Sequence, residues 1–197
     1  MWEKAEKHLS KDRYIGHLVK KYGHCKIEQR VHMDYFQGLV GEIIGQQLSG
    51  RVADVIYDRL KKKVKGRLTP RKILTLSDQE LRDCGMAWAK VRSIKDLAQR
   101  VKENKLQIRK LKVLSDNEVM KELIAVKGIG RWTAEMFLMF SLGRADIFPD
   151  DDLGIRKGFT KVVGINIQGE KMVIFAERWK PYRTVASWYL WRSLENT

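Results

Sequence analysis

The chain has 197 residues, of which 44% are hydrophobic, and this composition is enough to bury a core and excludes a disordered tail. Its 39 basic and 24 acidic residues give a formal net charge of +15, which favours a polyanion such as nucleic acid as the partner. There is no run of about 18 apolar residues and no apolar core of a secretory signal. We therefore expect an intracellular protein without a membrane span, cytoplasmic with the nucleoid in a prokaryote and nuclear in a eukaryote.

Apolar residues recur mostly at spacings of three and four, which predicts an all-helical protein of about ten helices. Side chains suited to capping a helix N-terminus predict where several of these helices begin. These candidate caps are Ser10, Asp34, Ser49, Thr69 before Pro70, Ser77 with Glu80, and Ser115 with Glu118.

The segment from Arg59 to Lys112 holds 18 basic and five acidic residues, a net charge of +13. A solvated helical surface would explain any one of these lysines or arginines. The segment as a whole still favours DNA binding, because neutralising phosphates releases counterions.

A helix predicted over residues 116–126 leads into the segment VKGIGRWTA at 126–134, after which an apolar helical pattern resumes. Two glycines that flank one aliphatic residue let the backbone turn tightly, and they let a phosphate oxygen approach bare amides. An ordinary turn between helices is the alternative, but the basic composition favours a helix-hairpin-helix at residues 116–142 that binds phosphate. Its candidate DNA contacts are Lys127, Gly128, Gly130, Arg131 and Thr133.

Three adjacent carboxylates, Asp150, Asp151 and Asp152, stand in a chain that is otherwise strongly basic. An aspartate directly before Leu153 is a good helix N-cap, worth about 1 kcal/mol. An ionised carboxylate that faces a flipped nucleotide would also stabilise the cationic sugar formed as a glycosidic bond breaks. Spacing alone leaves capping and catalysis both open.

Histidine and cysteine usage argues against a metal centre. All four histidines lie within the first 32 residues and no pair has a helical metal-ligand spacing, so we expect no zinc. Cys25 and Cys84 cannot supply a disulfide framework or a four-thiolate iron–sulfur cluster, so we expect inert thiols and no such cluster.

Four blocks in this order resemble one family: residues 43–49 (IIGQQLS), 126–134 (VKGIGRWTA), 148–156 (FPDDDLGIR) and 177–183 (ERWKPYR). Together they are similar to the helix-hairpin-helix DNA glycosylases, in particular the alkylbase or 3-methyladenine DNA glycosylase II branch. The resemblance extends from about Leu9 to Trp191. It implies an all-α fold with two helical lobes around a cleft. One lobe would be a central helical barrel of residues 38–148, and the other would join residues 1–37 to 149–197.

The resemblance also implies roles for individual residues. Asp152 corresponds to the essential catalytic aspartate, and Trp132 and Trp191 correspond to aromatic residues of the base pocket. Met136 stands at a pocket position that is aromatic in some relatives, so we expect a wider pocket and a different substrate range. Trp132 also occupies the position where glycosylases that nick the abasic strand carry a Schiff-base lysine, so we expect base release through water without lyase activity.

Further positions follow from the same resemblance. Gln47 corresponds to the wedge that fills the duplex after a base flips out. The backbone carbonyls of Ile124, Val126 and Ile129 correspond to positions that hold a monovalent cation, Na⁺ or K⁺, in relatives. Lys127 replaces a proline that is common in this hairpin. We expect no required cofactor.

The sequence therefore predicts a monomeric, monofunctional DNA glycosylase that removes alkylated purines of the 3-methyladenine or 7-methylguanine type from double-stranded DNA. A cationic alkylated purine suits electron-rich aromatic faces and leaves with little acid catalysis. One alternative is a glycosylase of the same fold for oxidised or deaminated bases. The other is a non-catalytic DNA-binding module in which the aspartates only cap a helix.

Overall fold

The computed structural model describes residues 2–27 and 34–195, and these ranges contain helices, turns and loops but no β-strand. The all-helical fold class is thus confirmed. Twelve α-helices lie within the described ranges, more than the periodicity predicted, because several apolar runs are divided by short turns. None of these helices is both long and apolar enough to cross a lipid bilayer.

The chain divides into two compact units, which we call the central unit, Val31–Ser141, and the terminal unit, Met1–Arg30 with Leu142–Thr197. The helices of the central unit are α3 (Tyr35–Gly45), α4 (Gly50–Lys63), α5 (Pro70–Thr75), α6 (Asp78–Asp83), α7 (Trp88–Lys102), α8 (Asp116–Ile124) and α9 (Arg131–Met136). A 3₁₀-helix at Ile108–Lys110 and a π-helix at Phe137–Ser141 complete it.

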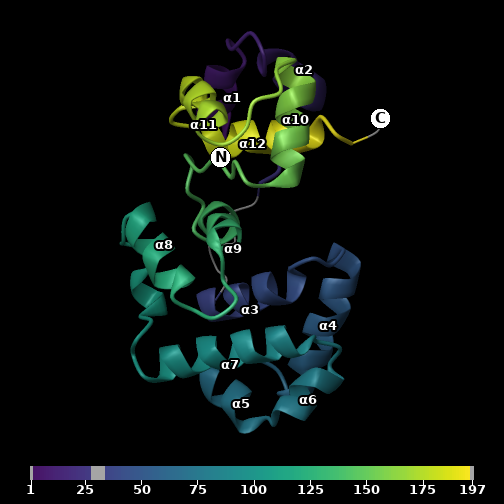
Figure 1. Cartoon of the computed structure of the whole chain (residues 1–197), viewed down its shortest axis with the longest axis vertical. Coiled ribbons are helices and arrows are strands. Elements are labelled where there is room, and N and C mark those ends of the chain that lie inside the picture. The colour runs from purple at the N-terminus through teal and green to yellow at the C-terminus, as the bar shows by residue number, and fades with distance from the viewer. Residues whose placement is uncertain (1, 28–33, 196–197) are drawn as a thin grey trace. The chain divides into compact units, whose positions relative to one another are not determined.

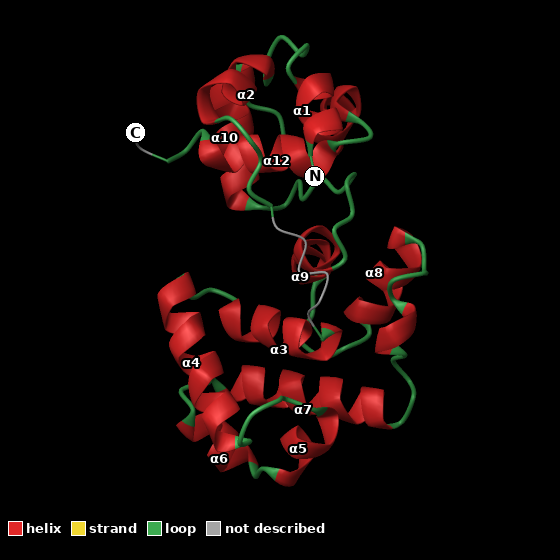
Figure 2. Ribbon diagram, turned by 180° about the vertical axis from the view of Figure 1, so that it is seen from behind, coloured by secondary structure: helices red, strands yellow, loops and turns green. Residues whose placement is uncertain are grey.

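Helices α3 and α7 lie side by side in the central unit, as both views show (Figures 1 and 2). Each buries apolar residues at helical spacing, with Leu39 and Ile43 on α3 and Val91 and Ile94 on α7 all fully buried. Burying each such side chain stabilises the fold by about 1.5–3 kcal/mol. The packed pair of α3 and α7 therefore gives a rigid support to the loops that follow these helices.

The terminal unit joins the two ends of the chain in one core (Figure 1). Its helices are α1 (Glu3–Leu9), α2 (Gly16–Tyr22), α10 (Leu153–Val163), α11 (Glu170–Ala176) and α12 (Arg183–Arg192), with a 3₁₀-helix at Glu177–Trp179. Helices α1 and α2 both pack on α12. Phe159 and Trp179, both fully buried, meet edge to face in this core.

Helices α10 and α12 approach each other closely because α10 carries two glycines. A Cβ atom on Gly158 would lie 2.4 Å from the carbonyl oxygen of Leu190, and one on Gly154 would lie 2.8 Å from Cδ1 of Trp191. Any larger residue would push the helices apart. The glycines therefore set the distance between the start of α10 and the aromatic end of α12.

Most of the predicted caps are confirmed. Asp34 accepts a hydrogen bond from the amide of Phe36, Thr69 caps α5 ahead of Pro70, and Ser77 and Ser115 form complete capping boxes with Glu80 and Glu118. Ser49 stands at the N-cap position of α4, although no hydrogen bond from its side chain caps the helix.

The prediction that a helix begins after Ser10 was wrong. Ser10 follows the end of α1, and its hydroxyl donates to the carbonyl of Lys7. The carboxylate of Asp12 instead accepts from the amides of Tyr14 and Ile15, just before α2. An aspartate two residues further on thus provides the acceptor that the sequence analysis assigned to the serine.

Candidate active site and nucleic-acid interface

The hairpin in the central unit runs from the end of α8 at Ile124 to the start of α9 at Arg131. Gly128 has φ +76°, and a Cβ atom there would lie 2.1 Å from the hydroxyl oxygen of Ser93 on α7. Glycine is therefore required at 128 for both its conformation and its space. Gly130 has an ordinary φ of −94° with open space around it, so the turn itself requires a glycine only at position 128.

The carboxylate of Asp96 on α7 binds the backbone of the hairpin. Its Oδ2 accepts hydrogen bonds from the amide of Lys127 at 2.9 Å and from Nε of Arg100 at 2.8 Å. Burial opposes ionisation of Asp96, but these two donors outweigh it and lower the pKa of the carboxyl below its usual value. A proline at 127 would have no amide hydrogen and could not make this contact, whereas the lysine makes it.

Gln46, the residue that follows α3, links that helix to the hairpin. Its Nε2 donates to the carbonyl of Gly128 at 2.9 Å and to Oγ1 of Thr133 at 3.0 Å. Thr133 is only 3% exposed, and its hydroxyl accepts the hydrogen bond from Gln46 inside the unit. Its amide lies in the first turn of α9. The sequence analysis did not assign a role to Gln46, and a pair of glutamines at a helix end was the one signal available.

Gln47, the predicted wedge, occupies the next position. It is exposed and has φ +56°, a left-handed conformation that is uncommon for a residue other than glycine. The exposed Leu48 follows it. A strained backbone at an exposed loop tip commonly accompanies a functional role.

The two basic flanks of the hairpin differ. Lys127 is exposed, whereas Nε of Arg131 donates to Oε1 of the buried Glu135 at 2.9 Å, one turn further along α9. This ion pair offsets part of the positive charge that the sequence analysis assigned to Arg131.

The three aspartates of the terminal unit have distinct surroundings. Asp150 is buried, and Asp151 pairs with Arg156. Asp152 caps α10, with Oδ1 accepting from the amide of Ile155 at 2.8 Å, so the predicted N-cap is confirmed.

The same oxygen of Asp152 also accepts from Nε1 of Trp191 at 2.8 Å. The structure therefore brings together, within the terminal unit, two of the residues that the resemblance singled out. One contact comes from the backbone of α10 and the other from a large side chain on α12. Together they fix the orientation of the carboxylate.

The other two predicted pocket residues, Trp132 and Met136, belong to α9 in the central unit. Trp132 is 36% exposed and Met136 is 5% exposed. Their spacing of four places them on the same face of that helix.

The candidate metal-binding groups in the described ranges are backbone carbonyls. The described ranges contain no cluster of three or more histidine, cysteine or acidic residues suited to a metal. The carbonyls of Ile124 and Val126 lie at the end of α8, where carbonyls lack partners within the helix, although that of Val126 accepts from the amide of Ile129 at 3.1 Å. Neutral oxygen donors of this type suit a monovalent hard cation.

Both cysteines are shielded. Burial raises the pKa of the Cys25 thiol to about 12 and also raises the pKa of the Cys84 thiol. Both thiols therefore stay protonated near neutral pH, which is consistent with the expectation that they are inert.

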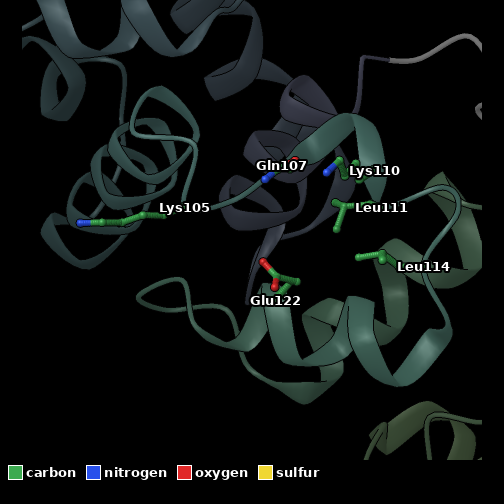
Figure 3. Close-up of a pocket in the computed structure, with 6 residues that line it drawn as sticks. All are labelled: Lys105, Gln107, Lys110, Leu111, Leu114 and Glu122. Atoms are coloured by element: carbon green, nitrogen blue, oxygen red, sulfur yellow. The ribbon is translucent and has the colours of Figure 1, made fainter.

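A cavity of about 190 Å³ lies elsewhere in the central unit (Figure 3). It is lined by Lys105, Gln107, Lys110, Leu111, Leu114 and Glu122. It contains no residue that the sequence analysis placed in the site, and both of its lysines belong to the basic segment.

Comparison with known proteins agrees with this geometry. The model of the HhH-GPD superfamily of base excision DNA repair proteins matches residues 40–184. The chain is 34% identical to "DNA-3-methyladenine glycosylase 1" of Schizosaccharomyces pombe over 96% of its length and 86% of that protein. It is 31% identical to the "alkylbase DNA glycosidase-like protein mag2" of the same yeast, over 97% of its length and 93% of that protein.

The fold of a solved relative points the same way. The structure of the S. pombe 3-methyladenine DNA glycosylase in complex with abasic DNA superposes with a TM-score of 0.81 at 34% identity, covering 96% of this chain and 95% of that one. Residues 40–184, which the family model matches, include the hairpin and Asp152. This chain belongs to the HhH-GPD superfamily of base excision DNA repair proteins.

Proposed function

We propose that the protein is a monofunctional DNA glycosylase that flips alkylated purines, of the 3-methyladenine or 7-methylguanine type, out of duplex DNA and hydrolyses their glycosidic bond. The observation that carries the proposal is the carboxylate of Asp152, fixed by the Ile155 amide and the Trp191 indole in a chain of net charge +15. The names of its relatives, which describe 3-methyladenine and alkylbase enzymes, support the substrate class.

Asp152 would act on the sugar. As the bond between C1′ and the base nitrogen lengthens, positive charge develops on the sugar ring, and an anionic carboxylate stabilises it electrostatically. The same carboxylate would orient the water whose oxygen bonds to C1′, and the proton that this water loses would pass to solvent. The electrons of the broken bond leave with the base, and an alkylated purine is a good leaving group because it already carries a positive charge.

The aromatic residues would select the base. Alkylation at N3 or N7 makes the ring cationic and electron-poor, so it stacks favourably on electron-rich aromatic faces. We assign this contact to Trp132 and Trp191, with Met136 beside Trp132 on α9. Trp132 lacks the amine that a Schiff base requires, so the reaction would end at the abasic site.

DNA binding would come mainly from the hairpin and the basic segment. The amides of Gly128, Gly130 and Thr133 would bind a phosphate, with Lys127 and Arg131 adding charge, and Gln47 would enter the duplex. The carbonyls of Ile124, Val126 and Ile129 would hold a monovalent cation, which would supply additional positive charge at the hairpin. With roughly five phosphates neutralised, the log–log dependence of binding on salt should have a slope of about −4.5. We propose that the protein works as a monomer in whichever compartment holds the DNA.

The decisive experiment measures bases freed from methylated duplex DNA by mass spectrometry, for the wild type and for Asp152→Asn. Asparagine caps a helix about as well as aspartate, so the fold should persist. We expect base release to fall by about 10²- to 10³-fold while binding to damaged DNA is retained or tightened.

Asp151→Asn is the matched control, because it removes a neighbouring carboxylate that pairs with Arg156. It should release bases at close to the wild-type rate. Unchanged release by Asp152→Asn would show that this carboxylate does not act in the reaction. No release by the wild type would favour a binding module. Release only from oxidised or uracil-containing duplexes would overturn the substrate class.

A further inference from the structure

The end of α3 is held by a lysine from the neighbouring helix. Nζ of Lys90, on α7, donates to the carbonyl of Ile44 at 2.7 Å and to the carbonyl of Gln46 at 2.8 Å. Carbonyls at the end of a helix have no partners within it, so the ammonium group satisfies acceptors that would otherwise need water. Lys90 is half-buried, and this burial lowers the pKa of its ammonium group.

Lys90 is the first of three residues on one side of α7 that contact the end of α3 or the hairpin. Lys90, Ser93 and Asp96 are spaced three apart, so they lie along one stripe of the helix. Lys90 holds the end of α3, Ser93 packs under Gly128, and Asp96 accepts the amide of Lys127.

Gln46 connects the two loops directly. Its carbonyl is bound by Lys90, while its amide nitrogen donates to Gly128 and Thr133. Gln47, with its left-handed backbone, follows at once. The peptide that precedes the wedge is thus fixed by α7 on one side and by the hairpin on the other.

We propose that Lys90 is a positioning residue that fixes the turn carrying Gln47. Because Gln46 in this turn also binds the hairpin, insertion of Gln47 into the duplex is coupled to phosphate binding by the hairpin. This inference rests on the proposed function, in which Gln47 enters the duplex. It assigns to Lys90 no contact with DNA, because its ammonium group is used by two carbonyls.

The test compares Lys90→Met with Lys95→Met. Methionine keeps the length of the side chain and removes its hydrogen bonds. Lys95 is the matched control, since it lies on the same helix and donates to the carbonyl of Leu76 after α5, away from the wedge. Lys90→Arg, which keeps charge and donors, is the conservative variant.

Three readouts separate positioning from other roles. Fluorescence of 2-aminopurine placed opposite an abasic analogue reports wedge insertion without any chemistry. Single-turnover base release reports the reaction, and the salt dependence of binding to undamaged duplex counts phosphate contacts.

We expect Lys90→Met to lower insertion and base release by about 10- to 100-fold, because small displacements of positioning groups carry costs of this size. Its salt slope should equal that of the wild type, Lys90→Arg should recover most of the loss, and Lys95→Met should change insertion by less than about twofold.

Two results would overturn the inference. If Lys95→Met lowers insertion as much as Lys90→Met, the effect is general loss of stability. If the salt slope of Lys90→Met is smaller by about one, Lys90 contacts a phosphate directly. A wild type that inserts its wedge but frees no alkylated base would contradict the proposed function and leave the role of Lys90 in place.

Discussion

The hairpin of the central unit and the aspartate of the terminal unit are positioned in opposite ways. In the hairpin the groups offered to a ligand are backbone amides, and side chains from elsewhere hold them: Asp96 binds the Lys127 amide and Gln46 binds the Gly128 carbonyl. At Asp152 the acting group is a side chain, held by a backbone amide and an indole. Function at the hairpin should therefore depend on distant side chains that hold its backbone. Function at Asp152 should depend on one amide close in sequence and one indole 39 residues away.

The largest effect on stability should come from Gly128→Ala. The new methyl group would enter the space of the Ser93 hydroxyl, 2.1 Å away, and the residue would keep a φ of +76°. We expect the free energy of unfolding to fall by about 2–4 kcal/mol, measured by urea denaturation.

Gly130→Ala is the matched control for that substitution. Its Cβ atom would meet no other atom within 4 Å, and its φ is ordinary. We expect a loss of less than about 1 kcal/mol. Equal losses for the two variants would contradict the view that only position 128 is fixed by packing.

A smaller effect, on activity alone, should follow Trp191→Phe. Phenylalanine keeps an aromatic ring but cannot donate to Asp152, so the carboxylate loses the hydrogen bond from the indole. We expect base release to fall by about tenfold, since a hydrogen bond to a charged group is worth about 1.5–3 kcal/mol.

Trp188→Phe provides the comparison for Trp191→Phe, because Trp188 lies one turn earlier on α12 and packs against Tyr189. It should leave single-turnover base release close to that of the wild type. A similar loss in both variants would show that the indole hydrogen bond has no special role in orienting Asp152.

The smallest effect should be the pH dependence contributed by Asp96. The pKa of this carboxyl is lower in the folded protein than its usual value of 3.8. The carboxylate therefore adds stability above that value, and the contribution is lost as the pH falls through the folded pKa. In urea denaturation, the difference between the wild type and Asp96→Asn should be constant from pH 5 to 7 and shrink below about pH 4. A difference that stays constant to pH 2 would contradict this.

Local features of the structure were predicted well. The caps at Asp34, Thr69 and Ser77 follow from side chains that reach amides two or three residues away, and so does Asp152 as the cap of α10. Ser10 was misassigned because Asp12, close by, offered a stronger acceptor.

The contacts that position the candidate site were not predictable in this way. Gln46 lies 82 residues from Gly128, and Lys90 lies 44 residues from Gln46. A lysine that caps a distant helix has the same sequence pattern as a lysine in solvent. The family resemblance singled out Asp152 and Trp191 as separate positions, but only the structure shows the hydrogen bond between them.

The two glycines of α10 have a consequence for how this protein tolerates change. Because Gly154 and Gly158 let α10 rest directly on Trp191 and on the backbone of Leu190, no adjustable spacer separates Asp152 from its indole partner. Substitutions that change the volume of the nearby aromatic core should then leave the distance between Asp152 and Trp191 unchanged. The distance between Asp152 and Trp191 therefore depends on two positions that have no side chain.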